Sequence, residues 1–175
     1  PDIVLLAEGK PIIVPCNNTQ GFKILPEQLE KHITENTKWL MLNSPSNPTG
    51  TVYSYEELKE LADILLKYPQ VQILSDDIYE KILYDDIKFN TIASVEPELK
   101  NRTITMNGVS KAYCMTGWRL GYCGGPKEII AAMNKIQSQS TTSTSSISMA
   151  AAIEALNSNQ DFIQIHNQHF KKRRD

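Results

Sequence analysis

Long apolar runs are missing from this sequence of 175 residues. No run approaches the roughly 20 consecutive apolar residues that a membrane-spanning helix needs. No signal peptide opens the chain either. We therefore expect no membrane partner.

An excess of charge is also missing, because 18 basic and 20 acidic residues give a formal net charge of -2. A surface that binds nucleic acid through bulk charge needs a clear basic excess, so we expect no nucleic-acid partner. The basic run 171–174 is interpreted as the solvated face of a helix.

Cysteine is scarce, and Cys16, Cys114 and Cys123 are scattered without metal-ligand spacing. This usage fits a reducing compartment, so we expect a cytoplasmic protein. Cys114 is interpreted as a packing residue. His166 and His169 lie three apart but have no third ligand at suitable spacing, so we assign no metal site.

The composition is that of a globular chain, with 41% hydrophobic and 22% charged residues. Its length suffices for one domain with a sizeable core. Short apolar runs predict strands, and apolar residues at helical spacing predict the helices between them. The alternation predicts an α/β domain in three layers with a mostly parallel sheet. Strands are expected at 11–15, 39–42, 71–74, 103–107 and 120–123, and helices after Pro26, Ser54 and Pro126, around 147–156, and from about Asp161.

Three polar residues each lie just after a predicted strand: Asn47, Asp76 and Lys111. Ligands of parallel sheets collect beyond the carboxyl ends of the strands, so we expect these residues to share one site. The small and apolar neighbours of Lys111 favour its neutral amine, which is the nucleophilic form. Arg119, eight residues later, could hold a phosphate by a planar two-point contact.

Three segments carry a family resemblance: Asn43–Gly50 (NSPSNPTG), Ser75–Tyr79 (SDDIY) and Asn107–Gly121 (NGVSKAYCMTGWRLG). In order and spacing they resemble the pyridoxal-phosphate (PLP) aminotransferases of the aspartate aminotransferase family, most of all its bacterial aspartate/prephenate branch. The resemblance implies the α/β large domain of that family. It also implies transfer of an amino group from an amino acid, most simply aspartate, to a 2-oxo acid such as 2-oxoglutarate, with prephenate as an alternative acceptor.

The resemblance also implies roles for single residues. Lys111 would form the Schiff base with the cofactor and then move a proton during catalysis. Asp76 would face the pyridine nitrogen; the adjacent Asp77 competes for this role, but the family places tyrosine three residues after the acid, and Tyr79 fits only Asp76. Tyr79 and Asn47 would donate to the phenolic oxygen of the cofactor, and Asn47 would also touch the substrate carboxylate.

The phosphate of the cofactor is assigned to Arg119, with Ser110 as a second contact. Other branches carry a serine three residues before the lysine, where this chain has Gly108, so that phosphate contact is absent or supplied elsewhere. The resemblance further implies a cis bond between Asn47 and Pro48.

We interpret residues 1–175 as the central part of the large PLP-binding domain, with the N-terminal segment and the small domain lying outside the sequence. The resemblance implies a homodimer for the longer protein. Two alternatives remain open: another PLP enzyme on the same fold, such as a carbon-sulfur lyase, and a non-catalytic remnant. The glycines between Gly121 and Gly125 lack the dinucleotide fingerprint, which leaves an NAD site as a weak rival.

Overall fold

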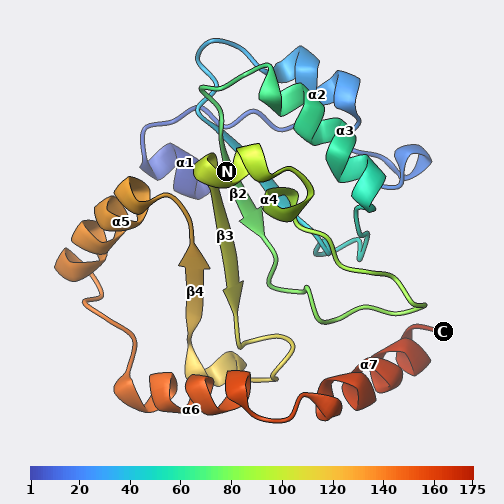
Figure 1. Cartoon of the computed structure of the whole chain (residues 1–175), viewed down its shortest axis with the longest axis vertical. Coiled ribbons are helices and arrows are strands. Elements are labelled where there is room, and N and C mark those ends of the chain that lie inside the picture. The colour runs from blue at the N-terminus through green and yellow to red at the C-terminus, as the bar shows by residue number, and fades with distance from the viewer.

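A four-stranded sheet forms the centre of the chain, whose residues 1–175 are all described by a computed structural model. The strands follow the order β1-β2-β3-β4 (Figure 1). β1 to β3 are parallel, and β4 runs antiparallel to β3. The sheet is therefore mostly parallel, as the sequence predicts. Its strands are β1 (Trp39–Asn43), β2 (Gln72–Asp76), β3 (Thr103–Gly108) and β4 (Gly121–Gly124).

Helices cover one face of the sheet and enclose the main core. Alternate strand residues such as Leu42 and Ile73 point into this core, where they join Leu61 and Leu65. The helix expected after Ser54 begins with a capping box: the Ser54 N–H donates to Glu57 Oε2 (2.7 Å), and the Glu57 N–H donates to Ser54 Oγ (3.2 Å). The covering elements are α2 (Pro26–His32), α3 (Tyr55–Leu66), α4 (Ile92–Val95) and the 3-10 helix η2 (Pro97–Arg102).

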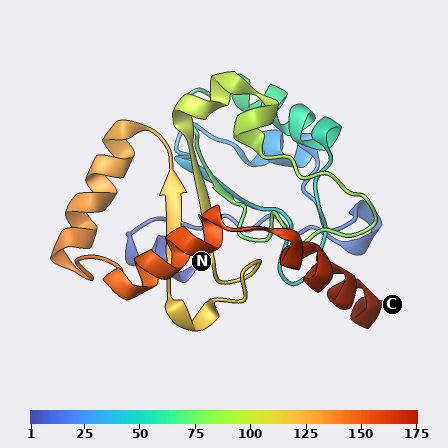
Figure 2. The same ribbon diagram turned by 60° about the horizontal axis from the view of Figure 1, so that its bottom comes forward.

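A second, smaller core lies under the loop that follows β3. Val109, Ala112 and Tyr113 of this loop pack against Ala152 and Ile163. In Figure 1 the two helices that carry these partners lie below the sheet, and in Figure 2 they come to the front, with α6 crossing before β4. The loop that contains Lys111 is therefore supported by the C-terminal helices. These are α6 (Ser146–Asn157) and α7 (Asp161–Arg174), which follow α5 (Lys127–Gln139) and the short η3 (Thr116–Trp118).

The strand predicted over residues 11–15 does not form. The segment has no regular secondary structure and pairs with no strand, and Ile12 and Ile13 are 58% and 69% exposed. Pro11 and Pro15 each lack a backbone N–H, which weakens any ladder at the ends of so short a segment. On either side of it lie α1 (Asp2–Leu6) and the 3-10 helix η1 (Asn18–Gln20).

Several expected elements form, but their apolar faces are less buried than predicted. The strands of parallel sheets are usually buried on both faces, yet Trp39 and Met41 of β1 are exposed. No residue of α5 is fully buried, and Ile136 is 73% exposed. α6 packs through Ser148 and Ala152 rather than through its larger side chains. None of the helices combines the length and the apolar character needed to cross a membrane.

Candidate active site

The carboxyl ends of the three parallel strands meet in one row. Asn43, Asp76 and Met106 are direct neighbours across β1, β2 and β3. Asn43 Nδ2 donates to the Asp76 carbonyl (3.0 Å), and the Asp77 N–H donates to the Met106 carbonyl (2.9 Å), which extends the ladder beyond the strands. The loops that carry the residues singled out by the sequence therefore leave the sheet at the same edge.

Lys111, Tyr79 and Asn47 come together at this edge. The Lys111 Nζ lies 5.6 Å from the centroid of the Tyr79 ring, over its face. The Tyr79 hydroxyl accepts a long hydrogen bond from Asn47 Nδ2 (3.5 Å). Lys111 and Tyr79 are half-buried, whereas Asn47 is exposed. An amine, a phenol and an amide from three separate loops thus point toward one another.

Asn43 orients the loop that carries Asn47, a role that the sequence did not reveal. The Asn47 N–H donates to Asn43 Oδ1 (3.0 Å), while the amide nitrogen of the Asn43 side chain holds the end of β2. The Asn47–Pro48 bond is cis, as expected, and so is Ser44–Pro45. Only one feature of the sequence could have indicated this role of Asn43. Asparagine is rare in strands, so an asparagine at the end of β1 is unusual.

The adjacent acids Asp76 and Asp77 lie in different environments. Asp77 is 2% exposed, and its Oδ1 accepts a hydrogen bond from the Ser75 hydroxyl (2.7 Å). Burial raises the pKa of the Asp77 carboxyl, an effect that hydrogen bonds from Ser75 and Thr91 oppose. Asp76 is half-buried, and its Oδ1 accepts only from the Ile78 N–H (3.3 Å). Successive residues of a strand point to opposite faces, so Asp77 follows Ser75 into the covered face and Asp76 points to the other face.

Ser110 and Arg119 are joined through Thr116, which sequence reasoning also missed. The Thr116 hydroxyl donates to the Ser110 carbonyl (3.1 Å), and Arg119 Nη1 donates to the Thr116 carbonyl (3.0 Å). Arg119 is exposed and adopts a left-handed backbone, with φ at 52°. Since a guanidinium has five N–H donors, most of them are available to a ligand.

Gly108 occupies a position where a side chain has little room. A Cβ added there would lie 3.0 Å from the Leu120 carbonyl oxygen and 3.3 Å from Gly121 Cα, because Gly108 pairs with Gly121 across β3 and β4. The serine of other branches would need the chain around Leu120 to shift. The close approach of Leu120 and Gly121 therefore explains why position 108 is a glycine in this chain.

Cys114 is not the packing residue that the sequence suggested. It is exposed, its backbone is left-handed with φ at 54°, and its Sγ lies 3.7 Å from His166 Nδ1. The His166 ring also meets Phe162 edge-on, with 5.5 Å between ring centroids.

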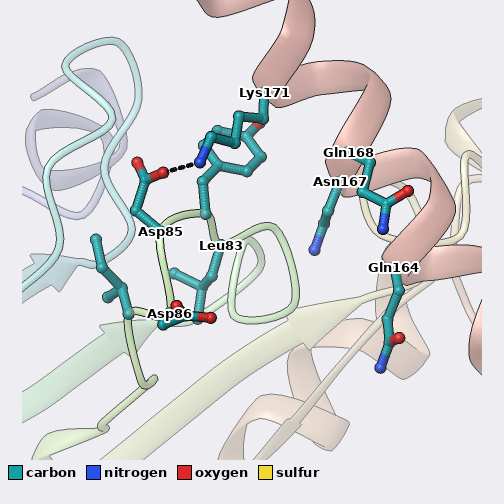
Figure 3. A pocket seen from close by; sticks show the side chains of 9 residues that line it. Leu83, Asp85, Asp86, Gln164, Asn167, Gln168 and Lys171 are labelled. Carbon is teal, nitrogen blue, oxygen red and sulfur yellow. Dashed lines mark hydrogen bonds and ion pairs between the residues drawn. The ribbon is translucent and has the colours of Figure 1, made fainter.

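A separate hollow of about 260 Å³ lies between the turn at Tyr84–Asp86 and α7. Figure 3 shows Asp85 paired with Lys171 on one side of it and Gln164, Asn167 and Gln168 along the helix. Asn167 Nδ2 donates to the Lys81 carbonyl (2.7 Å), and its Oδ1 is buried without a hydrogen-bond partner. None of the residues predicted for the site lines this hollow.

Comparison with known proteins identifies relatives along the whole chain. The sequence model of the family described as "Aminotransferase class I and II" matches residues 1–175. An aspartate aminotransferase of Rhizobium meliloti is 53% identical over 99% of this chain and 42% of its own length. An aspartate/prephenate aminotransferase of Cereibacter sphaeroides is 54% identical over 100% of this chain and 44% of its own length.

Solved structures match as closely. The crystal structure of the aspartate aminotransferase from Rhizobium meliloti has a TM-score of 0.98 at 53% identity, and the match covers 99% of this chain and 44% of that one. The aspartate aminotransferase from Thermus thermophilus with maleate has a TM-score of 0.92 at 41% identity, and the match covers 100% and 45%. These matches confirm the α/β fold class expected from the sequence. The chain spans less than half the length of the curated relatives it matches.

Proposed function

Because the chain belongs to the class I and II aminotransferase family, we propose that it forms the central part of the large domain of a PLP-dependent aminotransferase. The observation that carries this proposal is the meeting of the Lys111 amine, the Tyr79 ring and the Asn47 amide at one edge of the sheet. Asp76 ends the strand at the same edge. Four different functional groups are thereby placed where parallel sheets bind ligands.

The residues present fit PLP by their chemistry. A primary amine beside a phenol suits the aldehyde and the phenolic oxygen of the cofactor, and a carboxylate suits a protonated ring nitrogen. Arg119 keeps free donors for a phosphate, and Ser110 is held to the same loop through Thr116. The cofactor supplies the electron sink of the reaction when it is bound.

The resemblance gives each residue a role toward the cofactor. Lys111 would hold it through the side-chain amine, and the freed amine would carry a proton at the substrate carbon. Tyr79 and Asn47 would donate hydrogen bonds to the phenolic oxygen. Asp76 would stabilise positive charge on the ring nitrogen by charge pairing. Asn47 would also bind the substrate carboxylate.

The substrates follow from the names of the relatives. Two of them are an aspartate aminotransferase and an aspartate/prephenate aminotransferase, so we assign aspartate as the amino donor and a 2-oxo acid as the acceptor. We also propose that the longer protein is a cytoplasmic homodimer. The N-terminal segment and the small domain of that protein would supply the residues that choose the substrate.

Borohydride trapping tests the cofactor site. The purified chain is mixed with PLP, reduced, digested and searched for the added mass, which we expect on Lys111. Lys81 is a matched control, because its Nζ also lies 5.6 Å from the centroid of a tyrosine ring, that of Tyr113. The label should disappear in Lys111→Ala and persist in Lys81→Ala. Label spread over many lysines would refute a specific site in this chain.

A further inference from the structure

A buried carboxyl group lies directly behind the candidate site. Asp77 is 2% exposed, and no salt bridge joins it to a basic side chain. Its Oδ1 accepts from the Ser75 hydroxyl (2.7 Å), and Ser75 Oγ lies 3.5 Å from Thr91 Oγ1 at the start of α4. A buried polar group costs free energy unless it is hydrogen-bonded, so an apolar residue would stabilise this position more simply. The carboxyl group needs another reason to be there.

The backbone of Asp77 connects the segments that carry the site. Its N–H donates to the Met106 carbonyl of β3, the strand that leads to Lys111 (2.9 Å), and its carbonyl accepts from the Glu80 N–H (2.8 Å). These bonds fix both ends of the turn between β2 and Tyr79. Asp77 thus anchors this turn to β3 through its backbone and to Ser75 through its side chain.

We propose that Asp77 is a positioning residue: its hydrogen bond with Ser75 holds the turn that aims Asp76 and Tyr79 at the cofactor. What the turn aims at rests on the proposed function. The hydrogen bond itself does not, because it is made within the chain. Asp77 touches no reacting atom in this scheme and acts only through its two neighbours.

The decisive feature is the acceptor oxygen, rather than the charge or the volume of the side chain. Asp77→Asn keeps an oxygen for the Ser75 hydroxyl, whereas Asp77→Leu keeps a similar volume and removes the acceptor. Ser75→Ala removes the donor of the 2.7 Å hydrogen bond and leaves Thr91 in place. Asp63→Asn is the control, since this acid is exposed and bonds only to Lys59.

Two measurements on each variant separate positioning from general stability. The first is the rate of hydrogen exchange at the backbone amides of residues 77 and 80, measured without cofactor and compared with the amides of β1. The second is the affinity for PLP, measured from the amount of borohydride-reduced label on Lys111 as the PLP concentration rises. We expect Asp77→Leu and Ser75→Ala to exchange about tenfold faster at residues 77 and 80, the effect of losing one buried hydrogen bond, and to bind PLP correspondingly more weakly. Asp77→Asn should behave like the wild type.

The outcomes decide the inference in both directions. The double variant Ser75→Ala/Asp77→Leu should show no more than the larger single effect, because both changes remove the same bond. Equal exchange in Asp77→Leu and Asp77→Asn would overturn the positioning role, and so would faster exchange spread evenly over β1 and the turn. If the wild-type chain is not labelled at Lys111, the proposed function fails, and the exchange data still decide whether Asp77 holds the turn.

Discussion

At the scale of the residue, the pairing of Gly108 with Gly121 sets a limit on what the loop before Lys111 can contain. The Cβ of an alanine at position 108 would lie 3.0 Å from a carbonyl oxygen that belongs to the backbone and cannot rotate away. We expect Gly108→Ala to lower the free energy of unfolding by about 1–3 kcal/mol, the usual cost of overpacking. Urea denaturation followed by circular dichroism measures this change.

Gly117 provides the comparison for that substitution. It lies in η3, between β3 and β4, is exposed, and has no atom within 4 Å of an added Cβ. Gly117→Ala should change the free energy of unfolding by less than about 0.5 kcal/mol, as most surface substitutions do. A similar loss in both variants would mean that loop flexibility, rather than the contact with Leu120, explains the glycine.

Asp76 and Tyr79 could be proposed from the sequence because their segment carries a family resemblance. The family places tyrosine three residues after the acid, so the resemblance assigns the ring nitrogen to Asp76 rather than to Asp77. Asn43, Ser75 and Thr116 could not be chosen in this way. Their roles arise from hydrogen bonds across strands or across a loop, and no periodicity in the sequence encodes which backbone group a side chain will meet.

At the scale of the element, the strands and helices that the sequence predicts correctly carry their own signals. α3 has a capping box and a regular apolar face, and β2 and β3 are short apolar runs. The segment 11–15 has the same kind of apolar run but no partner strand within the chain. A strand forms only when it pairs with a distant segment, and a local pattern of apolar residues does not show whether that partner is present.

The C-terminal end of α7 makes ion pairs that the sequence did not predict. Asp85 bonds to Lys171 and to Arg174 (3.0 Å for Nη1 to Oδ2), and both contacts lower the pKa of its carboxyl. Asp85→Asn should leave the core unchanged and speed hydrogen exchange in the last turn of α7. Because the folded carboxyl has the lower pKa, the ion pair is present above the unfolded pKa and is lost as pH falls through the folded value. The wild type should therefore approach the variant in acid.

The adjacent Asp86 is the matched control for this prediction. Its backbone is also left-handed, with φ at 58° against 59° for Asp85, and it makes no salt bridge. Asp86→Asn should leave exchange in α7 unchanged, since asparagine tolerates this conformation well. Added salt should weaken the wild-type effect, because exposed charges are screened. If hydrogen exchange in α7 is equally fast in both variants, the ion pairs of Asp85 do not stabilise its last turn, and packing alone does.

At the scale of the whole molecule, large apolar side chains remain at the surface on two sides. Trp39 and Met41 lie on β1, and Ile136 and Ile147 lie where α5 leads into α6. Single exposed apolar residues are normal, but several large ones at the adjoining ends of two successive helices indicate a surface that associates with another. The chain covers 42% of the length of the Rhizobium meliloti relative, so such surfaces are consistent with a part of a larger assembly.

We therefore expect the isolated chain to self-associate, and we expect Ile136 and Ile147 to contribute. Fully burying an isoleucine is worth about 1.5–3 kcal/mol, so Ile136→Lys/Ile147→Lys should weaken association by roughly a hundredfold or more. Sedimentation equilibrium should then show a species near the single-chain mass of 19.7 kDa where the wild type is heavier. Gln137→Lys/Gln139→Lys adds the same charge at exposed positions of α5 and should leave association nearly unchanged. If both double variants dissociate equally, added charge is the cause, and the apolar surface between α5 and α6 plays no part.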